Sequence, residues 1–132
     1  EILTIEGEQE IQSIAKQGFK SHTVNSYCLD LDTDLRQFIS KNDYFDCVIF
    51  DANHRLKPTI DYFNTCLEKI SIDGFFIIDD IYWSKEMTEA WNQIKSHPKV
   101  TVSIDLFHFG IVFFRKEQRK EQFTLRQFQL LH

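Results

Sequence analysis

Acidic residues at strand ends, together with one histidine, are the side chains of this sequence whose types and spacing could carry out chemistry. Asp51 and Asp79–Asp80 each follow an apolar run directly, and His54 lies three residues after Asp51. Carboxylates that converge repel one another, so such a cluster requires a shared proton, a cationic ligand or a divalent metal with oxygen ligands. A histidine beside the cluster can act as a general base at neutral pH, although a lone loop histidine is more often a surface residue.

Two further acids follow weaker apolar runs earlier in the chain. Glu6 ends the first of these runs, and Asp30 follows the second. A carboxylate just past a strand of a nucleotide-binding sheet can accept hydrogen bonds from both hydroxyls of a ribose, which we expect of Glu6, with a solvated strand end as the alternative. Asp30 is placed to accept a hydrogen bond from an adenine amino group, with helix capping by Asp30 or Asp32 as the alternative.

The elements that must position the later acids are strands of a parallel sheet. Phe45–Phe50 is almost wholly apolar, as is typical of a strand covered on both faces, so we expect it to be central. Phe75–Ile78 is a second run of this kind. Because open α/β sheets bind ligands beyond the carboxyl ends of their strands, the two runs predict that Asp51, Asp79 and Asp80 meet at one edge.

Shorter strands and amphipathic helices alternate along the rest of the chain. We expect strands at 2–5 and 23–29, each followed by a helix, and a third helix that starts near Pro58 and ends at Asp73–Gly74. Ser84 is a favourable N-cap for a fourth helix. The apolar face of that helix would comprise Met87, Ala90, Trp91 and Ile94. This alternation predicts a Rossmann-like, three-layer α/β fold with a single, mostly parallel sheet.

An antiparallel hairpin is expected after the fourth helix. Val100–Ile104 alternates apolar with polar residues, and the apolar segment Gly110–Phe114 follows with no room for a helix between them. A parallel crossover needs a dozen or more residues, so the two segments must pair in opposite directions. If Val100–Ile104 runs parallel to the earlier strands, the hairpin loop lies at the same carboxyl edge as Asp51 and Asp79.

The tip of this hairpin is unusually apolar. A solvated turn rarely has such a composition, so we expect a pocket wall or a contact surface, with a loop packed on the chain's own core as the alternative. The substrate pocket would comprise Trp83, Phe107, His108 and Phe109.

Composition narrows the class of protein. The 132 residues carry a formal net charge of -5 and a pI near 5.5, which argues against nucleic acid as the main partner, because such binding needs a basic field. No apolar run approaches the roughly 20 residues that cross a bilayer, so we expect no membrane partner. Three cysteines without CxxC spacing indicate buried free thiols in a cytoplasmic protein rather than disulfides or structural zinc.

Four segments resemble the later two-thirds of a class I S-adenosylmethionine-dependent methyltransferase, and in particular bacterial members related to the catechol and caffeoyl-CoA O-methyltransferases. They are residues 4–7, 45–55, 76–83 and 100–107. The resemblance implies a Rossmann-like fold with a terminal antiparallel hairpin, S-adenosylmethionine as cofactor, and methyl transfer to an acceptor that we expect to be a small molecule.

The resemblance also implies roles for individual residues. Glu6 would bind the cofactor ribose and Asp30 its adenine side. Asp51 would bind the cofactor and act in catalysis at the reacting edge, where metal-dependent members have a metal ligand for an ion such as Mg²⁺. The pair Asp79–Asp80 matches an Asp-Asn ligand pair, and His54 falls where those enzymes have a catalytic lysine. Because Asp80 replaces the asparagine and His54 the lysine, metal use and the identity of the base both stay open.

The family's first strand and glycine-rich loop have no counterpart in this sequence. We therefore interpret residues 1–115 as a partial methyltransferase-like domain of a fragment, and residues 116–132 as an arm that binds a partner or covers the core. The chain alone is expected to bind the cofactor poorly and to be inactive. The missing strand would lie between Ile2–Ile5 and Phe45–Phe50, and the gap would be closed by direct pairing of these strands or by a second molecule in a homo-oligomer.

Three other classes of protein share some of these features. A fragment of an NAD-binding oxidoreductase would use the same acid at Glu6. A receiver-type signalling domain also has clustered aspartates, but its acid pair follows the first strand, whereas Asp79–Asp80 comes late. A non-catalytic α/β interaction module would present the aromatic residues Phe107, Phe109 and Phe123 to a partner.

Overall fold

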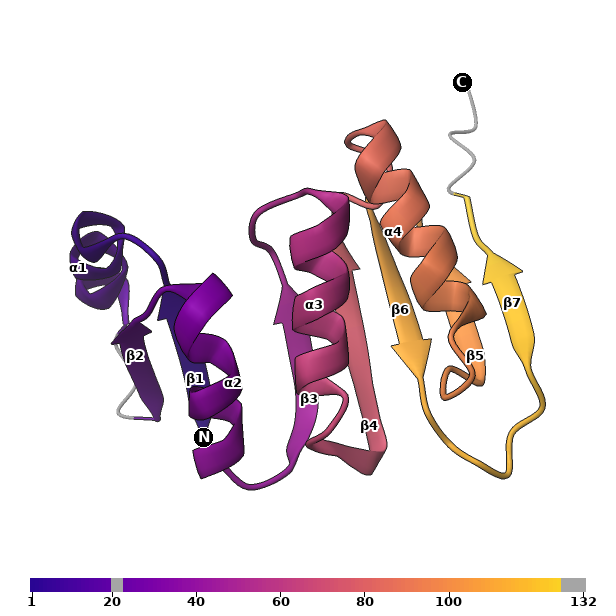
Figure 1. Cartoon of the computed structure of the whole chain (residues 1–132), viewed down its shortest axis with the longest axis horizontal. Helices are drawn as coiled ribbons and strands as arrows, with labels where there is room; N and C mark the ends of the chain where they lie inside the picture. Colours follow the sequence, from indigo (N-terminus) through magenta and orange to yellow (C-terminus); the bar gives the residue numbers. More distant parts are fainter. Residues whose placement is uncertain (20–22, 127–132) are drawn as a thin grey trace, which may run out of the picture. The chain divides into compact units, whose positions relative to one another are not determined.

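The structure, a computed structural model, describes residues 1–19 and 23–126 and divides the chain into two units. The first unit spans residues 1–41 and contains β1 (Ile2–Glu6), α1 (Gln9–Gly18), β2 (Val24–Cys28) and α2 (Leu31–Lys41) (Figure 1). Its two strands pair in parallel, in a register that runs from Ile2 opposite Val24 to Glu6 opposite Cys28. The predicted strand and helix order is confirmed over this unit.

The first unit has few buried residues. Leu35 and Ile39 of α2 are buried, and Tyr27 of β2 contacts the Phe38 ring edge to face at 4.9 Å. In α1 the buried residue is Gln12, whereas the apolar Ile14 is 70% exposed. The apolar face of α1 is therefore largely uncovered.

The second unit spans residues 42–132 and contains a five-stranded mixed sheet. Its strands are β3 (Phe45–Phe50), β4 (Ile70–Asp79), β5 (Val102–Asp105), β6 (Phe109–Phe113) and β7 (Glu121–Thr124). The strand order is β3-β4-β6-β5-β7. Only β6 runs against its neighbours, so β3, β4, β5 and β7 end at the same edge of the sheet. The predicted antiparallel hairpin and its placement at the carboxyl edge are confirmed.

The position of β3 differs from our prediction. Its boundaries are those predicted, but it is an edge strand of the five-stranded sheet, and Ile49 is 64% exposed. The described strands form two sheets, one in each unit. Closure of the gap, by direct pairing of β1 with β3 or by a second molecule, stays a prediction. An apolar run shows that a strand suits burial, but the number of its neighbours depends on the rest of the fold.

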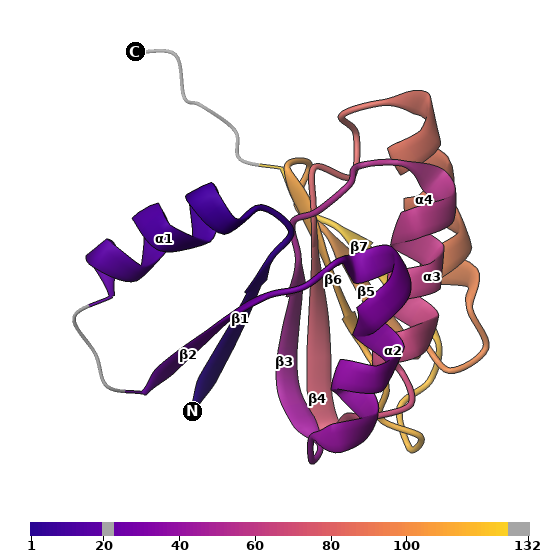
Figure 2. The ribbon, with the colours of Figure 1, turned by 60° about the vertical axis from the view of Figure 1, so that its left-hand side comes forward.

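Both helices of the second unit lie on the same face of its sheet. These are α3 (Leu56–Cys66) and α4 (Lys85–Ser96), which pack against each other (Figure 2). Ser84 caps α4 as predicted, since its hydroxyl accepts a hydrogen bond from the Met87 amide at 3.1 Å. The fully buried core under these helices includes Trp91, Phe63, Phe76, Ile78, Ile81, Ile94 and Val112. Most of the apolar burial in the described chain is thus in this unit.

The boundary between α3 and β4 was wrongly predicted. The helix ends at Cys66, and β4 already begins at Ile70, so Gly74 lies inside the strand rather than ending a helix. The pairing of β3 with β4 is irregular here, because Phe45 pairs with Ile70 whereas Cys47 pairs with Phe75. A β-carbon at Gly74 would approach the Ile70 side chain to 2.7 Å, so a larger residue here would require that side chain to shift.

The C-terminal arm contributes a strand that the sequence pattern did not show. Within it, β7 pairs in parallel with β5, and all four residues of β7 are exposed. Phe123 and Leu125 are described and exposed, whereas Phe128, Leu130 and Leu131 lie outside the described residues. The role of the arm as a partner-binding or core-covering segment stays a prediction.

The three cysteines are free, as predicted, but they are not all buried. Cys66 is buried, and this burial raises the pKa of its thiol to about 12, whereas Cys28 and Cys47 are exposed. Cys47 lies in β3, and the apolar sequence of this strand does not reveal its exposed positions. Over residues 1–19 and 23–126, no helix combines the length and apolar composition needed to cross a membrane.

Candidate active site at the carboxyl edge of the second unit

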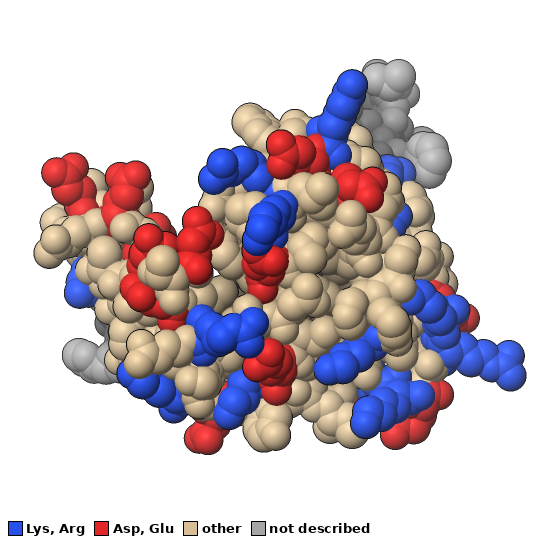
Figure 3. All heavy atoms as spheres, in the orientation of Figure 1, with Lys and Arg blue, Asp and Glu red and all other residues tan. Residues whose placement is uncertain are grey.

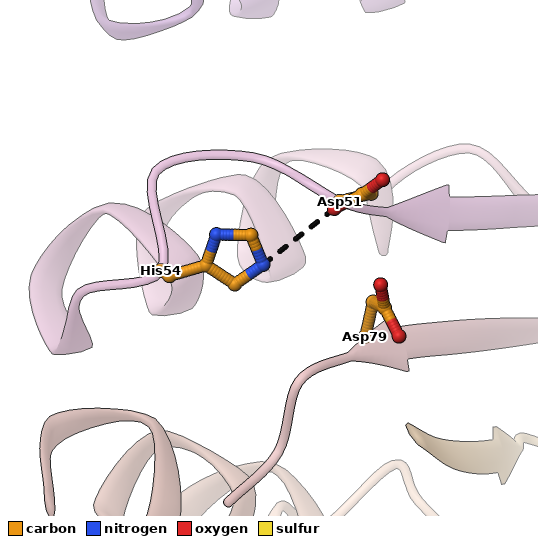
Figure 4. A group of neighbouring side chains, drawn as sticks. All are labelled: Asp51, His54 and Asp79. Carbon is orange, nitrogen blue, oxygen red and sulfur yellow. Dashed lines mark ion pairs between the residues drawn. The ribbon is translucent and has the colours of Figure 1, made fainter. Parts of the chain in front are cut away.

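The predicted convergence of strand-end acids occurs at the carboxyl edge of the second unit. Asp51 follows β3, Asp79 ends β4, and these two strands are parallel neighbours. Together with His54 from the loop after β3, each residue offers one ligand atom, and these atoms lie within 4.8 Å of one another. Figure 4 shows the imidazole turned toward the Asp51 carboxylate. Parallel pairing of two strands that both end in aspartate is sufficient to build this cluster.

His54 connects the acids of the two strands. Its Nε2 atom lies 3.5 Å from Asp51 Oδ1 and 3.6 Å from Asp80 Oδ2. The same atom is buried and has no hydrogen-bond partner among the described residues. A buried polar atom without a partner costs free energy, so its position among carboxylates points to a proton or a cation as the missing partner. Asp80 therefore joins the group formed by Asp51, His54 and Asp79.

Strained backbone is concentrated at this same edge. In the described part of the chain, Asn53, Asp80 and Phe107 are the non-glycine residues with positive φ, at 59°, 52° and 74° respectively. They lie in the loops that follow β3, β4 and β5. Asparagine and aspartate tolerate this conformation, but a bulky residue such as Phe107 is a clear outlier. Such strain often marks a functional site, because the surrounding structure must hold it in place.

Hydrogen bonds fix the loop that carries His54. Asn53 donates from Nδ2 to the Tyr62 hydroxyl at 3.1 Å and accepts from Arg55 Nε at 2.9 Å. The Glu86 carboxylate accepts from the Leu56 amide at 2.9 Å, which ties the start of α3 to the first turn of α4. The loop that presents His54 is thus held by side chains of both helices.

The hairpin tip that we expected to form a pocket wall lies at this edge and is not packed into the core. Trp83, Phe107 and Phe109 are 74%, 51% and 36% exposed, and His108 is also exposed. The Phe107 ring contacts the ring of Tyr82, from the loop after β4, at 5.8 Å between centroids. The alternative of a loop buried in the chain's own core is therefore excluded for Phe107.

A buried carboxylate at the end of β5 was missed by the sequence analysis. Asp105 is 4% exposed and accepts hydrogen bonds from the Tyr82 hydroxyl, Trp91 Nε1, the Phe107 amide and Arg126 Nη1. Its signal in the sequence is that it ends the third parallel strand of this unit in the way that Asp51 and Asp79 end theirs. Arg126 gave no signal, because its contact with Asp105 is formed only when β7 joins the sheet.

The ionisation of this group follows from its partners. Burial by itself raises the pKa of Asp105, but hydrogen bonds from Tyr82, the Phe107 amide and Arg126, together with the Arg126 charge, hold the pKa below its ordinary value. The hydrogen bond to Asp105 raises the pKa of the Tyr82 phenol. At neutral pH the site therefore contains a carboxylate and a neutral phenol.

The predicted cofactor-binding acids lie in the first unit. Asp30 caps α2, since its Oδ1 atom accepts a hydrogen bond from the Asp32 amide at 2.9 Å and its carbonyl accepts from the Asp34 amide at 2.8 Å. This is the capping alternative that we considered. Glu6 ends β1 as expected, opposite Cys28 of β2. Because both acids belong to the first unit, their convergence with Asp51 and their contacts with a cofactor stay predictions.

Charge on the visible surface is mixed in sign. In the view of Figure 3, acidic and basic side chains are interspersed with uncharged atoms. This agrees with the modest net charge of -5.

Solved methyltransferase structures are similar to this chain. MycE of the mycinamycin biosynthetic pathway, solved with Mg, SAH and mycinamycin VI, matches with a TM-score of 0.67 at 14% identity over 87% of this chain and 36% of its own. PaMTH1 from Podospora anserina, solved with SAH, matches with a TM-score of 0.66 at 15% identity, over 88% of this chain and 61% of its own. TomG from Streptomyces achromogenes is an O-methyltransferase of tomaymycin synthesis, solved with SAM. It matches with a TM-score of 0.66 at 17% identity, over 86% of this chain and 61% of its own.

The chain has a class I S-adenosylmethionine-dependent methyltransferase fold. It spans about 36 to 61% of the length of these three structures. Neither a protein-family model nor a curated protein matches the sequence. The resemblance to this fold that we inferred from the sequence is confirmed.

Proposed function

We propose that this chain provides the reaction edge of an S-adenosylmethionine-dependent O-methyltransferase that acts on a small molecule. The observation that supports the proposal best is the meeting of Asp51, His54 and Asp79 at the carboxyl edge of a methyltransferase-type sheet. The cofactor supplies a methyl group on a positively charged sulfur. An acceptor oxygen would displace that sulfur in line, forming a carbon–oxygen bond as the carbon–sulfur bond breaks.

His54 is the proposed general base. Its Nε2 atom is buried, lacks a hydrogen-bond partner in the described chain and lies between two carboxylates. In the reaction the acceptor hydroxyl proton would move to this nitrogen, and Asp51 and Asp80 would stabilise the imidazolium that forms. Orientation of the acceptor would come from the aromatic residues Trp83 and Phe107, which are exposed at the same edge.

A divalent cation fits the donor set of this site. Asp51, Asp79 and Asp80 offer the hard oxygen ligands that Mg²⁺ and Mn²⁺ prefer, and their mutual repulsion is offset by such an ion. The buried Nε2 atom of His54, which has no hydrogen-bond partner in the described chain, supports the presence of a further ligand. The three aspartates would hold the ion, whose positive charge would polarise the acceptor oxygen and favour loss of its proton.

Glu6 and Asp30 are proposed to bind the cofactor from the first unit, through the ribose hydroxyls and the adenine respectively. An NAD-dependent oxidoreductase would use Glu6 in the same way, so the cofactor class needs its own test. Two further expectations belong to this proposal: a cytoplasmic location, which fits three free cysteines, and a homo-oligomer in which a second molecule pairs with β3, an edge strand of its sheet.

The cofactor class is tested by a thermal-shift assay on the protein translated from its native reading frame. We expect SAH to raise the melting temperature and NAD⁺ to leave it unchanged, and Glu6→Ala to abolish the SAH effect. Glu8→Ala, at the exposed N-cap of α1, is the matched control and should keep it. Stabilisation by NAD⁺ but not by SAH would contradict the proposal.

A further inference from the structure

The buried carboxylate of Asp105 joins three separate segments of the second unit. It accepts from the hydroxyl of Tyr82 in the loop after β4, from the Phe107 amide in the hairpin at 3.0 Å, and from Arg126 Nη1 at 2.9 Å. The last of these residues follows β7 near the end of the described chain. One carboxylate thus ties two loops of the candidate site to the C-terminal strand.

Arg126 does more than neutralise this charge. Its Nη1 atom also donates to the carbonyls of Asp105 and Leu125, at 3.1 and 3.2 Å, and its guanidinium lies over the Phe107 ring at 5.6 Å. Phe107 is in turn the residue with the strained φ of 74° and the ring that contacts Tyr82. Arg126 therefore covers the residue whose conformation most needs external support.

A buried carboxylate needs both hydrogen bonds and a nearby positive charge. Asp105 is almost completely buried, whereas the Arg126 side chain is 38% exposed. The ion pair therefore lies at the protein surface, with the carboxylate on its buried side and the guanidinium on its exposed side. If Arg126 were absent, Asp105 would keep the Tyr82, Trp91 and Phe107 donors but lose its only charged partner among the described residues. The hairpin tip would then lose both the charge and the cation–π contact that hold Phe107.

We propose that Asp105 and Arg126 are positioning residues, which fix the loop of Tyr82 and Trp83 and the tip around Phe107 beside Asp79 and Asp80. The C-terminal strand β7 is thereby part of the site, because it delivers Arg126. The functional role of this positioning rests on the proposed function, since these two loops would contact the methyl acceptor. The physical link itself is independent of methyl transfer and can be measured without it.

The link is tested by hydrogen exchange, followed by mass spectrometry, on the 132-residue chain. Arg126→Ala should make the amides of residues 81–83 and 106–109 exchange about tenfold faster or more, the change expected when charge-assisted hydrogen bonds of about 1.5 kcal/mol are lost. Amides in the centre of β4 and β6 should keep their rates. Asp105→Asn should reproduce the result, because a neutral amide does not hold the guanidinium.

Two variants separate positioning from general stability. Arg126→Lys keeps the positive charge. It should reverse at least about half of the increase in the logarithm of the exchange rate that Arg126→Ala causes. Arg119→Ala removes an exposed arginine from the loop before β7 and should change nothing. Equal exchange in Arg126→Ala and Arg119→Ala would overturn the inference, and so would a rise that includes the centre of β4 to the same extent.

Cation binding distinguishes this inference from the proposed function. A Mn²⁺ titration of the Arg126→Ala variant should give an affinity within about threefold of the parent, because Arg126 is not a proposed ligand and it contacts Asp105, Leu125 and Phe107. Faster loop exchange with Mn²⁺ binding intact supports the positioning role. Faster loop exchange in a chain that binds no Mn²⁺ also supports the positioning role. In that case the proposed metal-assisted function is contradicted, but the positioning role is not.

Discussion

The two units use the same sequence signal, an acid at the end of a strand, with different results. In the first unit, Asp30 turns its carboxylate to the start of α2 and caps that helix. In the second unit, Asp51 and Asp79 end adjacent parallel strands and meet a histidine. A strand-end acid therefore becomes chemically useful when a neighbouring strand ends in another acid and a third group shares the space.

The units also differ in how much apolar surface they bury. The second unit contains Trp91, Phe63 and Phe76 at 0 to 1% exposure, whereas the first has an apolar helix face with Ile14 at 70% exposure. Catalytic groups need a rigid support, since small displacements reduce the rate strongly. The unit that gathers the candidate catalytic residues is the one with the larger core.

The largest expected effect follows from separating the units. Residues 42–132 should unfold cooperatively on their own, because the core under α3 and α4 lies within them, whereas residues 1–41 are too few to bury a sufficient core and should be largely unfolded. Circular dichroism during thermal unfolding of the two peptides measures this. A sharp transition in residues 1–41, at a midpoint independent of concentration, would remove the contrast between the units.

Truncation of apolar side chains should destabilise the second unit more than the first, with a smaller effect than division of the chain. Trp91→Ala removes a completely buried side chain that packs against Gly110, and it should lower the free energy of unfolding by about 3–5 kcal/mol. Ile14→Ala, on the exposed face of α1, should change it by no more than about 0.5 kcal/mol. Urea unfolding of both variants gives the comparison. Similar losses would mean that the α1 face is covered in solution.

The smallest expected effect is a pH dependence at the end of α4. Burial, and then the charges of Lys99 and Lys120, lower the pKa of His97 below its ordinary 6.5, and its Nδ1 atom accepts a hydrogen bond from the Lys99 amide at 3.2 Å. As the pH falls below 6.5, the unfolded chain takes up a proton that the folded chain resists, so stability should decrease.

Replacement of this histidine should remove that decrease. His97→Gln should have a flatter stability curve than the parent between pH 7 and 5.5, whereas His108→Gln, at the exposed hairpin tip, should retain the parental slope. Urea midpoints across this pH range give both slopes. Parallel curves for the parent and His97→Gln would show that His97 does not carry the effect.

Local signals in the sequence were sufficient for much of the fold. Apolar spacing predicted the limits of β3 and the buried face of α4. The Ser84 cap was also predicted, because this side chain bonds to an amide only three residues away. Parallel pairing then brought Asp51, Asp79 and Asp80 near His54 without further information.

Features that depend on distant pairing could not be predicted. The early start of β4 at Ile70 follows from an irregular register with β3, and β7 becomes a strand only because β5 offers it an edge. The contact of Asp105 with Arg126 requires that edge, and the exposure of Ile49 requires knowledge of which strands flank β3. Each depends on a partner far along the chain rather than on neighbouring residues.

A Mn²⁺ titration followed by electron paramagnetic resonance tests most directly whether the acids of the second unit form a functional site. The parent chain should bind one ion, Asp51→Asn should weaken binding about tenfold or more through the loss of a charged ligand, and Asp30→Asn should leave it unchanged. Absence of binding to the parent chain, or equal weakening by the two substitutions, would contradict the proposal that the strand ends of the second unit meet to do chemistry.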